Sequence, residues 1–251
     1  MSLPLDGRAL TWEGCLNVRD LGGLPTADGG TTRRGAVVRA DSVRQLSDVG
    51  WAALVSYGIG RIIDLRWHVE LAADPPHELP VDIVHIPLFP EPDTEPWREI
   101  DMIHDATPDA GAARSAGYVE CLERFAPSFV AAVDAVVGTP KGGALVHCMG
   151  GKDRTGLVSA LVLRLAGVTI EDIAEDYALS GQNLRAATQD WIASASDEVE
   201  RRRRERLSVT PASAMATVLH EVEARHGGTR QYLLNAGADR ELVERAERLL
   251  R

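Results

Sequence analysis

The feature that most constrains this sequence is a short apolar stretch at residues 144–147 that runs through a glycine-containing segment into a helical pattern. The apolar stretch predicts a buried strand, and residues 154–166 predict a helix. Gly150 and Gly151 permit the tight loop that must join the two. The chain therefore has to bring a strand end and a helix N-terminus together around one loop, and we expect that strand to be central in its sheet.

The rest of the N-terminal half alternates strands and helices. Apolar or β-branched stretches predict further strands at residues 34–39, 59–65 and 81–88. Ser47 and Thr169 are expected to cap helices, because a hydroxyl at this position accepts a hydrogen bond from the first helical turn. This order of elements predicts an α/β fold.

Two longer parts of the chain have a different character. Residues 89–114 are rich in Pro, Asp and Glu and have little periodicity, which predicts a long surface excursion. One helix is expected from residue 115 to residue 137. Residues 183–251 predict further helices, with breaks at Pro211 and at glycines.

Composition and length limit the class of protein. With 251 residues, 45% of them hydrophobic and 25% charged, the chain can bury a core without disulfide or metal staples. We expect a single domain over residues 1–251. The net charge of −10 disfavours nucleic acid as a partner, because phosphate backbones bind to basic surfaces. No apolar stretch approaches the roughly 20 residues of a membrane-spanning helix, so no integral membrane segment is expected.

The N-terminal sequence and the cysteines bear on the cellular compartment. Residues 1–14 have no basic start followed by an apolar core, so we expect no secretory signal. Cys15, Cys121 and Cys148 are an odd number of widely spaced cysteines, which is typical of free thiols in a reducing compartment. These features favour a cytoplasmic protein, and export without a cleaved signal stays open.

The chemistry of the chain is concentrated at residues 147–156, which read HCMGGKDRTG. A loop between a strand and a helix can curl its N–H groups around a tetrahedral oxyanion, and the helix N-terminus adds positive potential. Cys148 lies at the centre of this field, which stabilises a thiolate and predicts a nucleophile at neutral pH. Arg154 carries a planar fork suited to two phosphate oxygens, and Thr155 can donate a hydrogen bond to the sulfur or the loop.

A structural interpretation of the same residues has to be weighed. A cysteine after a strand is usually a small buried apolar residue, and a glycine pair is usually a turn. The spacing of Cys148 and Arg154, with a preceding histidine and a following Thr-Gly, is much more specific than either feature alone. Cys15 and Cys121 have no such context, so we expect them to be structural.

The segment resembles the active-site loop of cysteine-dependent protein tyrosine phosphatases. More narrowly, its HCxxGKDRTG pattern is similar to that of the bacterial tyrosine phosphatase family that includes protein tyrosine phosphatase B. The resemblance spans nearly the whole chain. Further matches are NVRDLGG at residues 17–23, DLR at 64–66 with Glu70, DYALS at 176–180, and the tail with Pro211, Met215, Tyr232 and Leu233.

The resemblance implies a cysteine-phosphatase-like α/β fold, a small and mostly parallel central sheet flanked by helices, with the loop at the carboxyl end of a central strand. It implies that Cys148 attacks phosphorus, that Arg154 holds the equatorial oxygens, and that water hydrolyses a phosphocysteine intermediate. No metal or other cofactor is implied. The implied substrates are phosphotyrosine, and also phosphoserine, phosphothreonine or phosphoinositides. The loop residues expected to bind phosphate or substrate are His147, Met149, Gly150, Gly151, Lys152 and Thr155.

The reaction requires an acid for the leaving oxygen. Many tyrosine phosphatases supply it from a Trp-Pro-Asp loop, and this chain has no such tripeptide. In the resembled family the aspartate of the active-site loop is the proposed acid, which is Asp153 here, and myotubularin-like lipid phosphatases carry an aspartate there too. The alternative is a structural carboxylate that pairs with an arginine. Asp20 and Asp64 are the next candidates for the acid.

Several other charged residues have two interpretations. Lys152 either binds substrate at the mouth of the site, as lysines do in phosphoinositide phosphatases, or is a solvated loop charge. Arg19 and Asp20 either form the rim of the pocket, or Arg19 is a buried ion-pair partner that holds a loop. Arg66 and Glu70 are expected to form a structural pair.

An arginine-rich segment lies between the loop and the C-terminal helices. Residues 197–206 read DEVERRRRER, which either attracts anionic substrate or membrane, or forms a solvated helix with ion pairs at i,i+4 spacing. In the resembled family a helical pair in this region forms a lid over the site. Residues 180–211 occupy that place here, and residues 92–117 are the rival lid.

Three classes of function are compatible with an anion-binding loop. The first is a phosphatase that acts on phosphotyrosine and related monoesters. The second is a non-catalytic phosphate-binding module, which would not need the thiol. The third is another thiolate enzyme, such as a sulfurtransferase or an arsenate reductase, whose loops do not share the full HCMGGKDRTG string. The first class explains the most residues, because it uses the cysteine, the arginine and the aspartate together.

Overall fold

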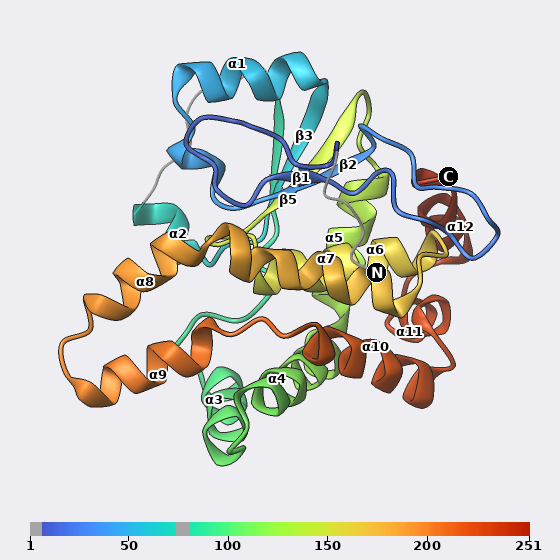
Figure 1. Cartoon of the computed structure of the whole chain (residues 1–251). Helices are drawn as coiled ribbons and strands as arrows, with labels where there is room; N and C mark the ends of the chain where they lie inside the picture. Colours follow the sequence, from blue (N-terminus) through green and yellow to red (C-terminus); the bar gives the residue numbers. More distant parts are fainter. Residues whose placement is uncertain (1–6, 74–80) are drawn as a thin grey trace.

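The computed structural model describes residues 7–73 and 81–251, and its centre is a five-stranded sheet (Figure 1). The strands lie in the order β1-β2-β5-β3-β4, so that β5 is central as the sequence predicts. The short β1 is antiparallel to β2, and all other neighbours are parallel. Their bounds are Arg19–Asp20 (β1), Val37–Ala40 (β2), Ile59–Asp64 (β3), Asp82–His85 (β4) and Gly143–His147 (β5).

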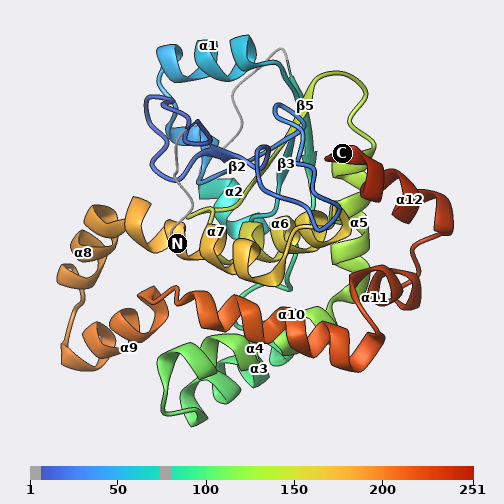
Figure 2. The same cartoon turned by 45° about the vertical axis from the view of Figure 1, so that its right-hand side comes forward.

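Helices cover both faces of this sheet, which confirms the α/β class (Figures 1 and 2). In chain order they are Asp48–Tyr57 (α1), His68–Ala73 (α2), Glu95–Ala106 (α3), Ala110–Arg124 (α4), Ala126–Val137 (α5), Asp153–Leu165 (α6), Ile170–Asn183 (α7), Arg185–Ala193 (α8), Glu198–Ser208 (α9), Ala212–His226 (α10), Thr229–Asn235 (α11) and Arg240–Leu249 (α12). None of the helices in the described residues is both long and apolar enough to cross a membrane.

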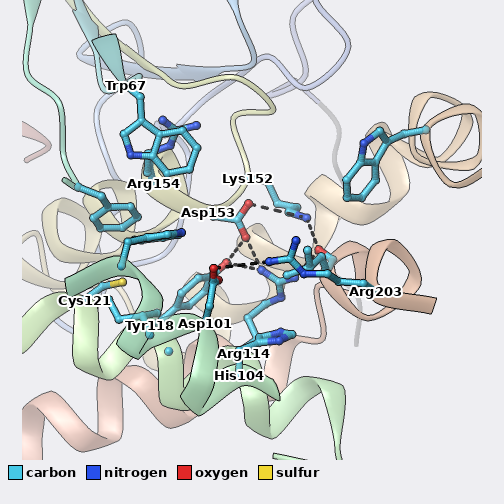
Figure 3. Close-up of a pocket in the computed structure, with 16 residues that line it drawn as sticks. Trp67, Asp101, His104, Arg114, Tyr118, Cys121, Lys152, Asp153, Arg154 and Arg203 are labelled. Atoms are coloured by element: carbon cyan, nitrogen blue, oxygen red, sulfur yellow. Dashed lines mark hydrogen bonds and ion pairs between the residues drawn. The ribbon is translucent and has the colours of Figure 1, made fainter. Parts of the chain in front are cut away.

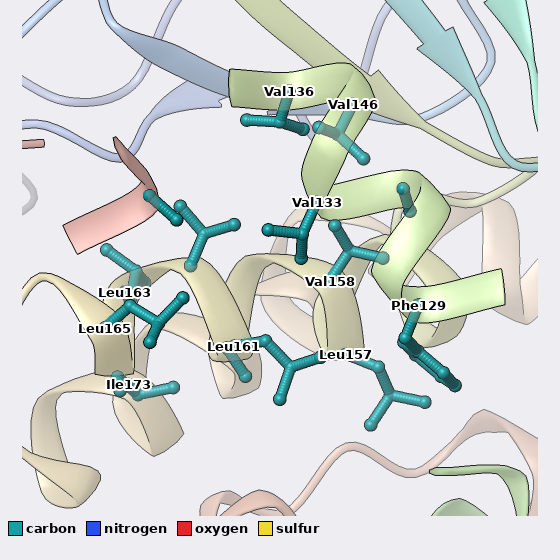
Figure 4. Packing of buried hydrophobic residues seen from close by; sticks show 14 of the residues in the cluster. Phe129, Val133, Val136, Val146, Leu157, Val158, Leu161, Leu163, Leu165 and Ile173 are labelled. Atoms are coloured by element: carbon teal, nitrogen blue, oxygen red, sulfur yellow. The ribbon is translucent and has the colours of Figure 1, made fainter. Parts of the chain in front are cut away.

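The two faces of the sheet bury different sets of side chains, because successive residues of a strand point to opposite sides. Val38, Leu145 and Ile62 lie in one row across three strands and pack towards α1. Val146 and Ile63 point the other way, into a larger core that includes residues of α5 and α6 (Figure 4). Burial on both sides explains why the central strand β5, GALVH, is almost entirely apolar.

The helix caps follow the sequence closely. Ser47 accepts a hydrogen bond from the N–H of Gly50 at 3.2 Å, and Thr169 accepts one from the N–H of Asp172 at 3.1 Å. Both helix starts were predicted from these hydroxyls. A hydroxyl at this position accepts a hydrogen bond from a backbone N–H group of the first turn, which has no partner within the helix.

The expected surface excursion at residues 89–114 is wrong, since most of it is helical. Helix α3 begins after Thr94, carries Pro96 in its first turn and buries Ile100, while Asp109 caps α4 by accepting a hydrogen bond from Ala112 N at 2.7 Å. These are ordinary helix-start signals. The polar composition concealed them, because only a narrow stripe of α3 faces the core.

The single helix expected from residue 115 to residue 137 is also wrong. It is two helices, α4 and α5, that meet at Phe125, with Pro127 in the first turn of α5. Proline removes a backbone donor and fits only the first turn of a helix, so a new helix begins there. The strand expected at residues 81–88 is present but shorter, as β4.

The C-terminal half of the chain is helical, with the predicted breaks. Helices α10, α11 and α12 follow Pro211, Gly227 to Gly228 and Gly237. Helices α8 and α9 form a pair that extends from the end of α7, and α9 lies beside α3 in both views (Figures 1 and 2).

One glycine tests how the central strands fit together. Gly60 lies at the register shift between β3 and β5, where an added Cβ would stand 1.6 Å from the carbonyl oxygen of Lys141. We expect Gly60→Ala to lower the free energy of unfolding by about 2–3 kcal/mol, because backbone must move to relieve this overlap. Denaturant unfolding at fixed pH measures the effect.

The matched control is Gly117→Ala in α4. There the nearest atom to an added Cβ is Ile100 Cγ2 at 3.7 Å, an ordinary contact. Alanine favours a helix over glycine, so this variant should be unchanged or more stable by up to about 1 kcal/mol. Equal stability losses in the two variants would contradict the packing described for β3.

Candidate active site

The loop between β5 and α6 is held from outside through its carbonyl groups. The carbonyl of Met149 accepts a hydrogen bond from Ser42 N at 2.9 Å. Asn17 Nδ2 donates to the carbonyls of Gly150 and Gly151 at 3.0 and 3.1 Å. A trans peptide points its N–H away from its C=O, so the amides that follow these carbonyls face the inside of the loop. Inward-facing amides in such an arrangement can bind an anion.

The loop passes so close to the end of β2 that one position requires glycine. Gly151 has φ +61°, and an added Cβ would lie 2.3 Å from the carbonyl oxygen of Ala40. No other residue fits this left-handed conformation against neighbouring backbone. The sequence predicted a glycine here because the loop is tight. The structure adds a second reason, which is the close approach of Gly151 to the backbone of β2.

Behind the loop, a buried carboxylate gathers three arginines. Asp176 of α7 pairs with Arg8, Arg19 and Arg39 at 2.7, 3.0 and 2.7 Å, and all four side chains are buried. Burial alone would raise the pKa of Asp176, but the three guanidinium charges hold it far below its usual range. Arg39 also donates to the carbonyl of Gly151 at 2.8 Å, so this cluster supports the loop directly.

Arg19 and Asp20 do not line the cavity beside the loop, although a rim position was one expectation for both. Arg19 is 1% exposed and donates to Asn17 Oδ1 at 2.7 Å, which turns the Asn17 amide nitrogen towards the loop. Asp20 is buried and accepts hydrogen bonds from the N–H groups of Gly22 and Gly35, each at 2.7 Å. The structure favours the alternative of a buried arginine that holds a loop.

Cys148 and its neighbours lie at the base of the loop. Cys148 follows β5 directly and is 2% exposed. Thr155, in the first turn of α6, is fully buried, and its hydroxyl has no hydrogen-bond partner within residues 7–73 and 81–251. His147 was expected to contact phosphate or substrate, but it is 1% exposed, with Nδ1 3.2 Å from the carbonyl of Cys148 and Nε2 3.6 Å from Asp64.

Arg154 pairs with Glu70, a carboxylate that the sequence had suggested as the partner of Arg66. Glu70 of α2 pairs with Arg154 at 2.5 and 2.9 Å, and the guanidinium lies over the ring of Trp67 at 4.4 Å. The expected pair of Arg66 and Glu70 is therefore wrong, because Arg66 pairs with Asp64 at 2.9 Å. The ends of β3 and β5 are neighbours in the sheet, which brings α2 to the start of α6.

Asp153 lies in a group of positive and hydroxyl donors (Figure 3). It accepts hydrogen bonds from Arg114 Nη1 at 2.5 Å and from the Tyr118 hydroxyl, and Lys152 Nζ is 3.7 Å away. Burial acts to raise the pKa of Asp153, but the charges of Lys152 and Arg114 outweigh it and the pKa lies below its usual value. Asp153 is therefore ionised at neutral pH in this structure.

Lys152 connects the loop with α9. Its Nζ donates to the carbonyl of Leu207 at 2.9 Å, and Arg114 donates to the same carbonyl. Burial lowers the pKa of Lys152, while the charge of Asp153 opposes this shift. The side chain is 16% exposed, so it is not a fully solvated loop charge.

Lys152, Asp153 and Arg154 line a cavity of about 360 Å³ (Figure 3). One part of its wall is apolar, and the other part carries charge. Both segments considered as lids contribute, residues 92–117 through α3 and α4, and residues 180–211 through α8 and α9. The apolar wall is Trp67, Phe89, Trp97, Ile100, Cys121 and Trp191, and the polar wall includes Asp101, His104, Arg114, Tyr118 and Arg203.

The structure thus brings the predicted loop residues together and adds partners that were missed. Arg39 and Arg114 carried no motif of their own, and Arg114 stood in the segment taken for an irregular excursion. Asn17, Glu70 and Asp176 did carry a signal, since each lies in a stretch that resembles the phosphatase family. Their roles became visible only from their contacts.

Comparison with known proteins supports the family that the sequence of the loop suggests. The sequence profile of the tyrosine phosphatase family matches residues 10–251. A tyrosine-protein phosphatase of Nostoc commune is 26% identical over 221 residues, covering 83% of this chain and 72% of the relative. The triple specificity protein phosphatase PtpB of Mycobacterium tuberculosis is 29% identical over 271 residues, covering 94% of this chain and 97% of the relative. The chain belongs to the tyrosine phosphatase family and is a protein-tyrosine phosphatase.

His147 makes stability depend on pH. Burial lowers its pKa to about 4 from an ordinary value near 6.5, and Asp64 only partly offsets this. The unfolded chain therefore binds a proton as pH falls below about 6.5, whereas the folded chain does not until about 4. Stability should fall by about 2–3 kcal/mol across this window because of His147.

Urea unfolding between pH 4 and pH 7 tests this dependence. The His147→Asn variant should lose less stability on acidification than the wild-type protein, whatever its stability at pH 7. The exposed His220 offers a matched control, since His220→Asn should keep the wild-type slope. An unchanged slope in His147→Asn would show that other groups cause the acid sensitivity.

Proposed function

We propose that the chain hydrolyses phosphotyrosine through a phosphocysteine formed on Cys148. The thiolate sulfur attacks phosphorus, the bond from phosphorus to the tyrosine oxygen breaks, and that oxygen takes a proton. Water then attacks the phosphocysteine, which releases inorganic phosphate and restores the thiolate. Besides water, these steps use only side chains and backbone amides of the chain itself.

The observation that supports this proposal most strongly is the orientation of the loop. Its carbonyls accept hydrogen bonds from Asn17, Arg39 and Ser42, so the N–H groups of the same peptides point the other way and are free to bind an anion. Donors fixed before the reaction stabilise charge that develops on the phosphoryl oxygens without a cost of reorganisation. Arg154 at the start of α6 adds a guanidinium group, whose charge is partly balanced by Glu70.

The cavity supports an aromatic substrate. Trp67, Phe89 and Trp97 form a continuous aromatic wall, with Phe89 and Trp97 stacked at 5.3 Å between ring centroids. A tyrosine ring can pack against such rings while its phosphate enters the loop. The PtpB relative is named a triple specificity phosphatase, so phosphoserine and phosphothreonine are proposed as further substrates. Phosphoinositides are proposed as a further class of substrate, because Lys152, Arg114 and Arg203 add positive charge to the wall of the cavity.

The helical pair α8 and α9 is proposed to act as a lid. Trp191 of α8 and Leu207 of α9 line the cavity, and Lys152 holds the Leu207 carbonyl. Helix α9 is joined in turn to the rival lid, since Arg206 donates to the carbonyls of Thr107 and Pro108 at 2.7 and 2.8 Å. The two segments therefore cover the site together in this conformation.

Asp153 is proposed to be the general acid. In the free enzyme it is ionised, which fits the alternative of a structural carboxylate paired with Arg114. A phosphate dianion in the loop, however, places two negative charges beside it and competes for Lys152 and Arg114. Both effects favour the protonated form, which could then donate to the leaving oxygen.

Replacement of the nucleophile tests the covalent mechanism. Cys148→Ser should abolish turnover of phosphotyrosine peptides, because a neutral hydroxyl without an adjacent base is a poor nucleophile. Binding of inorganic phosphate should persist, since the loop amides and Arg154 remain. Kinetics and calorimetry on the purified variant measure both, with Cys15→Ser as the matched control that should keep full activity.

The substrate range is measured by phosphate release from three panels of substrates, namely phosphopeptides, phosphoinositides and aryl phosphates. Turnover by Cys148→Ser at a rate comparable with the wild-type rate would refute the phosphocysteine. Phosphate binding by a wild-type protein that turns over none of the panels would instead show a non-catalytic binding module.

The acid is tested with a series of leaving groups. Asp153→Asn should lower kcat on phosphotyrosine by about 10² to 10⁴, the usual range for general acid catalysis. Phosphates of strongly acidic phenols should lose much less, because their leaving oxygens need no proton. Asp101→Asn, which removes another carboxylate from the cavity wall, serves as the control. If wild type and Asp153→Asn show the same dependence on leaving-group pKa, Asp153 is structural.

A further inference from the structure

Two side chains of α4 donate hydrogen bonds to one oxygen of Asp153. Arg114 and Tyr118 are four residues apart, which places them on the same face of the helix. Arg114 Nη1 donates to Asp153 Oδ1 at 2.5 Å, and the Tyr118 hydroxyl donates to the same oxygen. The side chains of Arg114 and Tyr118 are both buried. One oxygen of the carboxylate, Oδ1, is thus held between two buried donors.

The other oxygen, Oδ2, has a different environment (Figure 3). It accepts no hydrogen bond from residues 7–73 and 81–251, and Lys152 Nζ lies 3.7 Å from it, beyond hydrogen-bond distance. A proton on Oδ1 would oppose the two donors there, so the carboxylate takes up a proton on Oδ2. Oδ1 keeps both hydrogen bonds in either protonation state, because a carbonyl oxygen and a carboxylate oxygen are both acceptors.

The direction of the Tyr118 hydroxyl follows from its other contacts. Its oxygen lies 3.0 Å from the hydroxyl oxygen of Tyr177, and Arg114 Nη1 donates to it at 3.2 Å. A phenol has one hydrogen to donate, and an ionised carboxylate can only accept. The Tyr118 hydrogen therefore goes to Asp153, and the hydroxyl of Tyr177 donates to Tyr118. Tyr177 is fully buried, so this chain of hydroxyls supplies one fixed donor to Oδ1.

We infer that Tyr118, together with Arg114, is a positioning residue that holds Oδ1 of Asp153 and reserves Oδ2 for proton transfer to the leaving oxygen. The inference rests on the proposed function, because it assumes that Asp153 donates this proton. As the O–H bond at Oδ2 breaks, its electron pair stays on the carboxylate and the proton bonds to the tyrosine oxygen. The charge that forms on Asp153 is stabilised by donors already in place. Tyr118 contacts Oδ1 alone, so it acts through Asp153.

Tyr118→Phe tests the inference, because it removes only the hydroxyl. A hydrogen bond to a charged group is worth about 10- to 100-fold, and part of that charge has formed in the transition state. We expect kcat on phosphotyrosine to fall by about 10-fold at the pH optimum, while KM changes little. Phosphates of strongly acidic phenols should lose less than about twofold, because their leaving oxygens need no proton.

The pH profile gives a second measurement. Loss of a donor to the charged form raises the pKa of Asp153, so the alkaline limb of the kcat profile should move to higher pH by about one unit. Tyr118→Phe retains the other titratable and charged groups that face this carboxylate or its partners. They are Arg114 and Cys121 of α4, His104 of α3, Tyr177 of α7, and Lys152 and Arg154 at the start of α6.

Tyr232→Phe is the matched control. The Tyr232 hydroxyl is also buried, and it donates to the carbonyl of Leu122 in the same helix, α4, at 2.8 Å. This variant removes a buried hydrogen bond to α4 that does not involve Asp153. Its free energy of unfolding should fall, but kcat, KM and the pH profile should match those of the wild-type protein.

A double-variant cycle separates positioning from general structural damage. In the Asp153→Asn background no acid is left to position, so adding Tyr118→Phe should lower kcat by less than about twofold. Equal losses in the wild-type and Asp153→Asn backgrounds would overturn the inference, as would a loss that is the same for all leaving groups. If Tyr118→Phe does not fold, Arg114→Gln removes the other donor to Oδ1 and should give the same dependence on the leaving group.

Failure of the proposed function is visible separately. Carboxyl ¹³C NMR follows the titration of Asp153 in Cys148→Ser with inorganic phosphate bound, with and without Tyr118→Phe. An unchanged pKa would overturn the inference even if Asp153 is the acid. A raised pKa, in an enzyme whose wild-type and Asp153→Asn forms share one dependence on leaving-group pKa, would mean that another group is the acid. The inference would then fail together with the proposed role of Asp153.

Discussion

The arrangement of the site depends on one buried carboxylate, Asp176. Three arginines in an apolar interior would be very unfavourable without an opposite charge, and removal of one partner from such a buried group typically costs about 3–5 kcal/mol. A single carboxylate cannot neutralise all three, so several of their other donors go to oxygens. Arg8 bonds to the carbonyl of Asp20, Arg19 to Asn17, and Arg39 to Gly151. The cluster that anchors α7 to the sheet thereby also holds the loop and leaves positive charge behind it.

The loop owes its chemistry to this support from behind. Peptide groups in a tight turn can point either way, and an unsupported loop would let them reorient. With the outward carbonyls satisfied by Asn17, Arg39 and Ser42, the inward amides have no competing arrangement. An anion can then bind without first reorganising the backbone, which is the main advantage of a preorganised site. The same contacts require glycine at position 151, where the loop meets the end of β2.

The charges around Asp153 connect the loop to the helices that cover it. Lys152 and Arg114 both face this carboxylate, and both donate to the Leu207 carbonyl at the end of α9. Any movement of α9 therefore changes the surroundings of Asp153 as well as access to the cavity. The position of α9 and the electrostatic surroundings of Asp153 are therefore linked through Lys152 and Arg114.

The sequence by itself determined the α/β fold class, the central strand and the loop that joins it to a helix, because the strand, the glycines and the helix start that make the loop are contiguous in the chain. It also indicated the Ser47 and Thr169 caps, which depend on local backbone donors. Only the tertiary structure decided the partners. Glu70 meets Arg154 and Arg114 meets Asp153 across long separations, and nothing in the local sequence indicates which charged residues pair with one another. Sheet order brings the ends of β3 and β5 together, and the packing of α3 and α4 brings Arg114 to the loop. These pairings follow from topology, which is why Glu70 was assigned to the nearer Arg66 and the helical wall at residues 95–106 was taken for an irregular excursion.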